Sequence, residues 1–290
     1  MPGNVLVLAA IVFLCTVMWP LNRWAVRGGS RPESIGVVIS IVMAALAAPA
    51  AWKAGVLSDA LPALLFGGIA GVAYAVGFVL IIFHCLKIGP AGPTVLINNL
   101  GMVWPIAISM IRYSHGTCPP AAHWVGLGCV AAALVLTGLN RGAPGSPAAV
   151  TRRWSAWVLV GWVFSGISQG CQFLSSQYAP RAAFAFPFAL GVVSFLLLLA
   201  VCVVRRNGPP RRVEVIAGMG TGAILAAALP MTLWLLAGRM SAAVVYPVTV
   251  AGPIVLMLLI GHAVLRERLN ATGWTASAAG VAGILLLSWR

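Results

Sequence analysis

Ten continuous apolar stretches, each about 20 residues long, dominate this sequence and are separated by short breaks that contain Pro, Gly or Arg. A stretch of this length crosses a bilayer as a helix, whereas a barrel strand would alternate apolar and polar residues over about ten positions. With 61% hydrophobic and 8% charged residues, the chain cannot form a water-compatible surface. We therefore predict an all-α integral membrane protein with ten transmembrane helices, over residues 5–26, 34–52, 61–86, 93–112, 121–139, 155–175, 183–204, 213–236, 241–262 and 271–289.

The basic residues predict the orientation of these helices. Lys and Arg number 18 against 4 Asp and Glu, and in a membrane protein such an excess marks cytoplasmic loops, so we expect no nucleic-acid partner. The positive-inside rule predicts a multi-pass protein of the cell (inner or plasma) membrane, with odd-numbered loops in the cytoplasm and both termini outside. The odd-numbered loops hold Arg27, Arg31, Lys87, Arg141, Arg152, Arg153, Arg205, Arg206, Arg211, Arg212, Arg266 and Arg268, and the other side holds Lys53, Arg112, Arg181, Arg239 and Arg290.

The chain resembles itself at a shift of 150 or 151 residues. We interpret residues 1–142 and 154–290 as two five-helix repeats joined by a linker at 143–153. An odd number of spans inverts the second repeat relative to the first, as in many secondary transporters. Chance similarity between apolar segments is the alternative, although two of the matches are small-xxx-small pairs, which have a steric role in helix packing. The matched residues are Gly67 with Gly218, Gly71 with Gly222, Trp124 with Trp274, Cys15 with Ser165, Trp19 with Gln169, and Asn22 with Gln172.

A polar stripe follows one face of the span 155–175. Ser165, Gln169, Gln172 and Ser176 recur at helical spacing, and Trp162 continues the same face. Amides facing lipid would be costly, so we expect this face to line an aqueous cavity. Hydrogen bonding between helices, worth about 1 kcal/mol per contact, is the alternative.

Two adjacent amides, Asn98 and Asn99, lie within the fourth span. Successive helical residues are about 100° apart, so the two side chains must point in different directions. Pro105 leaves the carbonyl of Gly101 without its usual helical partner, which loosens the helix near these amides. A shift of 150 places Asn99 on Thr249, in a span that also carries two prolines, and matching loosened helices in inverted halves predict a binding site at mid-depth.

Carboxylates are confined to loops and helix ends, where Glu33, Asp59, Glu214 and Glu267 lie. A carboxylate at membrane depth is the usual proton relay, so cation substrates and carboxylate-based proton antiport are disfavoured. His84 remains a candidate for coupling because a histidine titrates near neutral pH. The residues His115, Cys118 and His123 lack a fourth metal ligand, and we predict neither a metal nor another cofactor.

Amides and aromatic rings together suit a hydroxyl-rich or amino-acid-like ligand. We therefore predict a secondary transporter, not an enzyme, which moves a small polar sugar-like or amino-acid-like metabolite by alternating access around a central cavity. A polytopic membrane enzyme acting on lipid head groups is the alternative, but the spans contain no paired carboxylates and no Asp–His constellation. The sequence is compatible with a homodimer. The predicted substrate-binding residues are Asn22, Asn98, Asn99, Trp104, Gln169, Gln172, Trp234, Tyr246 and Thr249.

Two segments resemble the drug/metabolite transporter (DMT) superfamily, in its form with two EamA-like domains. They are "LKIGPAGPTVLINNLGMVWP" at 86–105 and "MSAAVVYPVTVAGPIVLMLLIGHAVLRERLNATGWTASAAGVAGILLLSW" at 240–289, whose "RERL" ending is the most specific part. The resemblance implies a ten-helix bundle of two inverted five-helix repeats around a central cavity. The chain departs from the family in two ways: the first half has "IRYSHG" in place of "RERL", and the charge bias puts the termini outside. The membrane glutamate of the small multidrug relatives is also missing, which argues against a drug/proton efflux pump.

Overall fold

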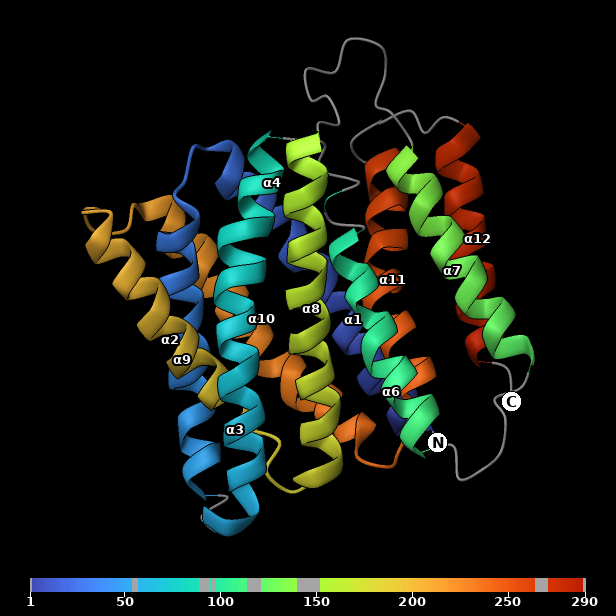
Figure 1. The fold of residues 1–290 in the computed structure, drawn as a ribbon, viewed down its shortest axis with the longest axis horizontal. Coiled ribbons are helices and arrows are strands. Elements are labelled where there is room, and N and C mark those ends of the chain that lie inside the picture. The colour runs from blue at the N-terminus through green and yellow to red at the C-terminus, as the bar shows by residue number, and fades with distance from the viewer. Residues whose placement is uncertain are drawn as a thin grey trace.

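The computed structural model describes residues 2–53, 57–88, 94, 97–113, 121–139, 152–263 and 271–288. Within these residues every regular element is a helix (Figure 1). The first part of the chain forms α1 (Pro2–Arg27), α2 (Pro32–Lys53), α3 (Leu57–Ala73), the π-helical η1 (Tyr74–Ile82), α4 (Phe83–Ile88), the 3₁₀-helical η2 (Leu100–Met102), α6 (Val103–Tyr113) and α7 (Ala121–Leu139). The second part forms α8 (Arg152–Tyr178), α9 (Ala185–Val204), α10 (Arg212–Leu236), α11 (Ala242–Ala263) and α12 (Ala271–Ser288).

The predicted spans coincide with these helices. Among the described residues of the predicted ranges, only Ala183, Phe184 and Ser241 are not helical. By length and hydropathy, five described segments are able to cross a membrane: Gly3–Val26, Pro32–Lys53, Ala60–Cys85, Ala185–Val204 and Arg212–Leu236. Large apolar side chains such as Trp52, Ile111 and Val204 are more than four-fifths exposed, which suits a surface surrounded by lipid. The protein is therefore an all-α, membrane-embedded protein.

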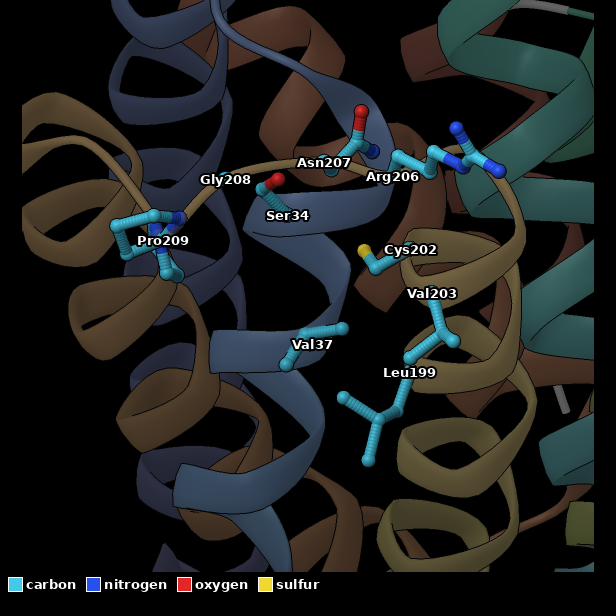
Figure 2. A pocket seen from close by; sticks show the side chains of 10 residues that line it. Ser34, Val37, Leu199, Cys202, Val203, Arg206, Asn207, Gly208 and Pro209 are labelled. Atoms are coloured by element: carbon cyan, nitrogen blue, oxygen red, sulfur yellow. The ribbon is translucent and has the colours of Figure 1, made fainter.

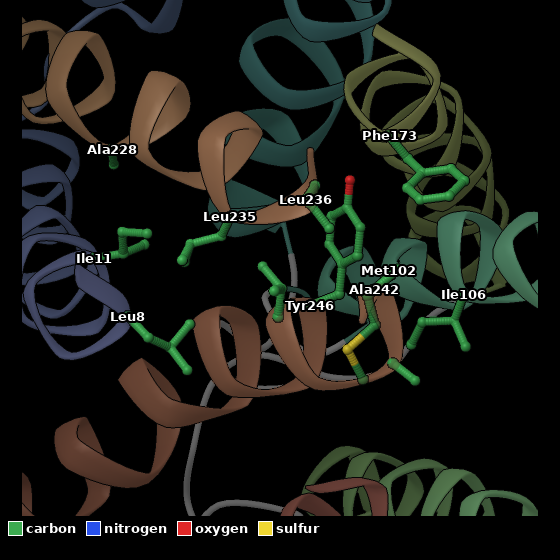
Figure 3. Close-up of a cluster of buried hydrophobic side chains, with 12 residues drawn as sticks. Leu8, Ile11, Met102, Ile106, Phe173, Ala228, Leu235, Leu236, Ala242 and Tyr246 are labelled. Atoms are coloured by element: carbon green, nitrogen blue, oxygen red, sulfur yellow. The ribbon is translucent and has the colours of Figure 1, made fainter. Parts of the chain in front are cut away.

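One hydrophobic cluster joins helices from both ends of the sequence (Figure 3). Its buried side chains come from α1, η2, α6, α8, α10 and α11, and Tyr246 lies among them with its hydroxyl group directed towards α8. The labelled members in Figure 3 are Leu8, Ile11, Met102, Ile106, Phe173, Ala228, Leu235, Leu236, Ala242 and Tyr246.

Helix α3 packs against α9 through two glycines. A Cβ atom at Gly67 would lie 2.5 Å from the carbonyl oxygen of Phe186, and one at Gly71 would lie 2.8 Å from that of Leu190. Both distances are too short for any side chain, so only glycine allows the two backbones to approach this closely. The close approach explains why small residues recur at four-residue spacing here.

Helix α10 packs against α2 in the same manner. A Cβ atom at Gly218 would lie 3.1 Å from the carbonyl oxygen of Ile35, and one at Gly222 would lie 2.7 Å from that of Ile39. The sequence-matched glycine pairs therefore perform the same steric role in two different helix interfaces.

Two ion pairs lie where the start of α2 meets the end of α9 and the start of α10. The Arg31 guanidinium donates from Nε and Nη2 to the fully buried Glu214 carboxylate, at 3.2 and 2.9 Å, and also to the carbonyl oxygens of Gly208 and Pro209. The hydrogen bond to Glu214 raises the pKa of Arg31, so its guanidinium stays charged at physiological pH.

In the second ion pair the arginine comes from the second part of the chain and the carboxylate from the first part. Arg205 donates to the Glu33 carboxylate at 3.1 Å, and the side-chain amide of Asn207 donates to the same oxygen at 2.9 Å. Both carboxylates lie in the first turn of a helix, where the positive end of the helix dipole also favours a negative charge.

We expect Gly71→Ala to lower the free energy of unfolding by about 1–3 kcal/mol, because its methyl group would overlap the Leu190 carbonyl oxygen. Thermal unfolding in detergent measures this change. Gly68→Ala is the matched control: its Cβ would meet its nearest neighbour at 3.8 Å, so its unfolding temperature should stay the same or rise. Equal losses in both variants would contradict the close-approach interpretation.

Removing the Arg31 side chain leaves a buried carboxylate without its main counter-charge, so Arg31→Ala should cost about 3 kcal/mol of stability. The same thermal measurement tests it. Arg212→Ala, which removes an exposed arginine at the start of α10, should change the unfolding temperature little. An Arg31→Ala variant as stable as Arg212→Ala would show that the ion pair contributes nothing.

Candidate functional site

Five buried polar atoms inside the bundle have no hydrogen-bond partner among the described residues. They are Asn22 Nδ2 on α1, the Tyr74 hydroxyl on η1, Asn98 Oδ1 just before η2, and Trp162 Nε1 and Gln169 Oε1 on α8. Leaving such an atom dry and unpaired costs about 1–3 kcal/mol, so a group of five requires a physical reason. Water or a polar ligand group between the helices supplies one.

Asn22 lies at the interface of α1 and α10. Its Oδ1 accepts a hydrogen bond from the Thr221 hydroxyl at 3.1 Å, while its Nδ2 is buried without a partner. Thr221 lies between Gly218 and Gly222, the two glycines through which α10 packs against α2. The asparagine therefore joins the two parts of the chain and still has a free donor.

The polar stripe on α8 is only partly hydrogen-bonded. Gln169 donates from Nε2 to the Ser165 hydroxyl at 3.2 Å, and its Oε1 remains unpaired. Ser176 donates to the Phe173 carbonyl oxygen at 2.6 Å, a bond within the helix itself. Gln172 is buried as well, at 8% exposure. The stripe thus contains both hydrogen bonds within α8 and unpaired atoms. Neither the aqueous cavity nor hydrogen bonding between helices accounts for all its residues.

The segment of Asn98 and Asn99 departs from regular α-helix at the position where Pro105 predicted loosening. Residues 97–99 are helical, Leu100–Met102 form the 3₁₀ turn η2, and α6 begins at Val103. A Cβ atom at Gly101 would lie 2.7 Å from the Ser165 hydroxyl oxygen, so η2 lies directly on the polar stripe of α8. Both amides are buried, at 4% and 8% exposure. Part of the predicted site is therefore assembled here.

Tyr246 and Thr249 approach the same region from α11. The Tyr246 hydroxyl donates to the backbone carbonyl oxygen of Gln169 at 3.0 Å, which ties α11 to the middle of α8. Thr249 turns back on its own helix and donates to the carbonyl oxygen of Val245 at 2.8 Å. The Tyr246 side chain is thus held beside the stripe by its hydrogen bond to α8. The Thr249 hydroxyl already donates within its own helix.

The remaining predicted residues are Trp104, Trp234 and His84. Trp104 packs edge-to-face with Trp162, with ring centroids 5.9 Å apart, and is 38% exposed. Trp234 is 37% exposed near the end of α10, where the Arg239 guanidinium stacks 4.1 Å from its ring. His84 on α4 is half-buried against Trp157 of α8. Trp104 borders the site through Trp162, but the structure does not bring Trp234 or His84 into it.

Tyr74 is the residue that best marks the centre of the bundle. It packs against three hydrophobic clusters whose members include Leu21 of α1, Cys171 of α8 and Leu225 of α10. It also begins the π-helical segment η1, and such segments occur often at functional sites. The Tyr74 side chain therefore packs against helices α1, α8 and α10, and its buried hydroxyl group has no hydrogen-bond partner among the described residues.

The five unpaired groups can form hydrogen bonds but carry no charge. Free donors are the Asn22 amide and the Trp162 indole, free acceptors are the Asn98 and Gln169 oxygens, and the Tyr74 hydroxyl can do both. No group of three or more His, Cys, Asp or Glu side chains suitable for a metal occurs among the described residues. His115 and Cys118 of the weak metal candidate lie outside the described residues.

No family model matches the chain, and no curated protein matches it. A protein of known crystal structure, whose description gives no function, has a similar fold. The two share 17% sequence identity, with a TM-score of 0.75 over 99% of this chain and 96% of the other. The protein thus shares its fold with a solved structure, and this likeness concerns the fold alone.

Sequence reasoning missed several polar contacts between helices, among them those of Thr221 and Gln177. Thr221 is a single polar residue in a glycine-rich helix face, and its position between two packing glycines is the signal that it faces another helix. Gln177 donates to the carbonyl oxygen of Leu236 at 2.9 Å and thereby joins the end of α8 to the end of α10. Gln177 comes one residue after Ser176, the last residue of the α8 stripe, so it lies off the helical spacing that defines the stripe.

Gln169 and Gln177 provide a matched pair for testing which amides stabilise the fold. Gln169→Leu removes a buried unpaired oxygen, so the unfolding temperature in detergent should stay the same or rise. Gln177→Leu leaves the Leu236 carbonyl oxygen without its partner and should cost about 1 kcal/mol. A Gln169→Leu variant that loses as much stability as Gln177→Leu would show that Gln169 is a packing residue.

Proposed function

We propose that this chain is a secondary transporter of a small, polar, uncharged or zwitterionic metabolite, sugar-like or amino-acid-like, which binds inside the bundle. The observation that carries the proposal is the group of five buried, unpaired polar atoms on helices from both parts of the chain. Natural membrane proteins rarely leave polar atoms in this state unless they line a water-filled or ligand-binding cavity. Asn22, Tyr74, Asn98, Trp162 and Gln169 are the proposed contacts.

We further propose ten transmembrane helices arranged as two inverted five-helix repeats. Exchange of the repeats would map α1 on α8, α2 on α9, the continuous helix of α3, η1 and α4 on α10, η2 with α6 on α11, and α7 on α12. The contact between α3 and α9 then becomes that between α10 and α2, and the contact between α3 and α8 becomes that between α10 and α1. The observed contacts between α6 and α8 and between α11 and α1 are also equivalent. This regularity supports the proposal.

The glycine interfaces support it at the level of single residues. A shift of 151 residues relates Gly71 to Gly222 and its contact Leu190 to Ile39. A Cβ atom at Gly71 would lie 3.0 Å from Val193 Cβ, and one at Gly222 would lie 2.9 Å from the Cβ of Val42, which is again 151 residues away. Chance similarity between apolar segments could match the glycines, but it would not also match the residues that the glycines contact.

The proposed orientation places the α1–α2 and α9–α10 connections in the cytoplasm. Both connections and the start of α8 lie at one end of the bundle in Figure 1, whereas the start of α1 and the end of α12 lie towards the other. The first end carries Arg31, Arg153, Arg205, Arg206 and Arg211, so the positive-inside rule favours this side as cytoplasmic.

Membership of the DMT superfamily is part of the proposal. It rests on the EamA-like segments of the sequence and agrees with the helix exchange described above. An enzyme acting on lipid head groups has less support, because Glu33 and Glu214 are both held in ion pairs at helix ends. A drug/proton efflux pump has less support for the same reason, since neither carboxylate is free to exchange a proton at membrane depth.

Transport in proteoliposomes tests the function. We expect uptake of at least one of a set of radiolabelled neutral sugars and neutral amino acids, tested one at a time. Gln169→Leu should lower that uptake about tenfold, because the substrate loses one hydrogen bond in a buried site. Gln177→Leu, whose amide is used within the fold, should retain the uptake of the folded fraction.

Equal uptake by Gln169→Leu and the unaltered protein would remove Gln169 from the site, and absence of uptake for every compound would contradict the transport function. An imposed pH gradient should leave uptake unchanged. Uptake that follows the gradient and loses this dependence in His84→Gln would instead assign proton coupling to His84.

A further inference from the structure

A hollow of about 390 Å³ lies between the start of α2 and the end of α9, and none of the residues with unpaired polar atoms lines it. Its walls include Ser34 and Val37 on α2 and Leu199, Cys202 and Val203 on α9, and the segment from Arg206 to Pro210 covers one end. Figure 2 shows Val37 and Leu199 facing one another across the space, with Asn207 and Gly208 at its edge. The volume is within the range of about 300–1,000 Å³ typical of small-molecule sites.

The hollow results from the way α2 and α9 cross. In the middle of the two helices a Cβ atom at Gly191 would lie 2.8 Å from the Ser40 carbonyl oxygen, and the Ser194 hydroxyl donates to the Ser40 hydroxyl oxygen at 2.8 Å. The helices are therefore closest at this crossing. In Figure 1, α9 runs obliquely to α2, so the two helices separate towards the end where the hollow lies.

The inner wall is apolar and continuous with the lipid-facing surface of α9. Leu199 is 39% exposed and Val203 is 69% exposed, and both belong to a helix long and apolar enough to cross the membrane. The hollow therefore extends from the helix ends into the depth at which acyl chains begin. A water-soluble metabolite would gain little from this wall, whereas an acyl chain would bury apolar surface against it.

One charged residue, Arg206, lines the outer rim. Arg206 lines the hollow, is exposed, and makes no ion pair within the part of the chain that the structure describes. Its backbone has a φ of 52°, a left-handed conformation that is uncommon outside glycine and carries some strain. Arg211 and Arg212 follow closely and are also exposed. Glu33 is the nearest carboxylate, and Arg205 and Asn207 already hold it.

We propose that this hollow binds the head group of an anionic phospholipid, with the phosphate against Arg206 and the first part of one acyl chain along Val37, Leu199 and Val203. Charge complementarity selects the occupant, because an arginine at the rim of an apolar wall matches a phosphate above an acyl chain. This assignment does not depend on transport, and it concerns a surface separate from the amides of Asn22 and Gln169.

Native mass spectrometry of the whole protein, titrated in detergent with phosphatidylglycerol or phosphatidylcholine, tests the assignment. We expect one phosphatidylglycerol to bind more tightly than phosphatidylcholine. Arg206→Ala should weaken phosphatidylglycerol binding about tenfold, because a charge-assisted contact to the phosphate is lost. Leu199→Trp keeps every charge but fills the hollow and should weaken binding at least as much.

Arg153→Ala is the matched control, since Arg153 is exposed at the same end of the bundle and does not line the hollow. Its binding should equal that of the unaltered protein. Equal losses in Arg153→Ala and Arg206→Ala would overturn the site in favour of general surface charge. Unchanged binding in a folded Leu199→Trp variant, equal binding of phosphatidylcholine, or displacement of the lipid by millimolar inorganic phosphate would each overturn it as well.

Discussion

The close approach of helix backbones at four glycines is the constraint on which this fold depends. Gly67 and Gly71 bring α3 onto α9, and Gly218 and Gly222 bring α10 onto α2. Inside a membrane the hydrophobic effect gives helices little reason to associate, because lipid is as apolar as a leucine side chain. Tight packing of small residues has to supply the attraction instead. Since α2 and α9 also contact each other, these interfaces form one continuous four-helix unit that supports the rest of the bundle.

This packing determines where polar residues can be tolerated. Helices α1 and α8, which pack against α10 and α3 of this unit, keep the amides of Asn22 and Gln169 buried even though each has an unpaired atom. Such atoms oppose folding, and a chain selected for stability alone would replace them with leucine. Their presence in helices from both parts of the chain is therefore more informative than the hydrogen bonds, such as that of Gln177, which contribute directly to stability.

Much of the helical organisation could be predicted, because length and hydropathy alone define a membrane-crossing helix. The burial of Asn98, Asn99 and Gln172 followed from their cost in lipid, and the glycine pairs followed from their spacing. The π-helical course of η1 could not be predicted, since "YAVGFVLII" is an ordinary apolar sequence and the register depends on its packing against α8. The partner of Asn22 and the exposed position of Trp234 could not be predicted either, because both depend on rotations of α10 that composition does not determine.

The ion pairs of Glu33 and Glu214 lie at one end of the bundle only. The residues 151 positions away from Glu33 and Glu214 in the repeat comparison are Phe184 and Ala63, neither of which carries a charge. These two ion pairs therefore have no equivalent at the positions that the repeat comparison assigns to them. In a carrier that opens alternately to its two sides, opening the arginine-rich end requires breaking both pairs, whereas opening the other end leaves both intact. Under the proposed transport function, the resting population would be biased towards one side before any solute arrives, and high ionic strength would reduce that bias.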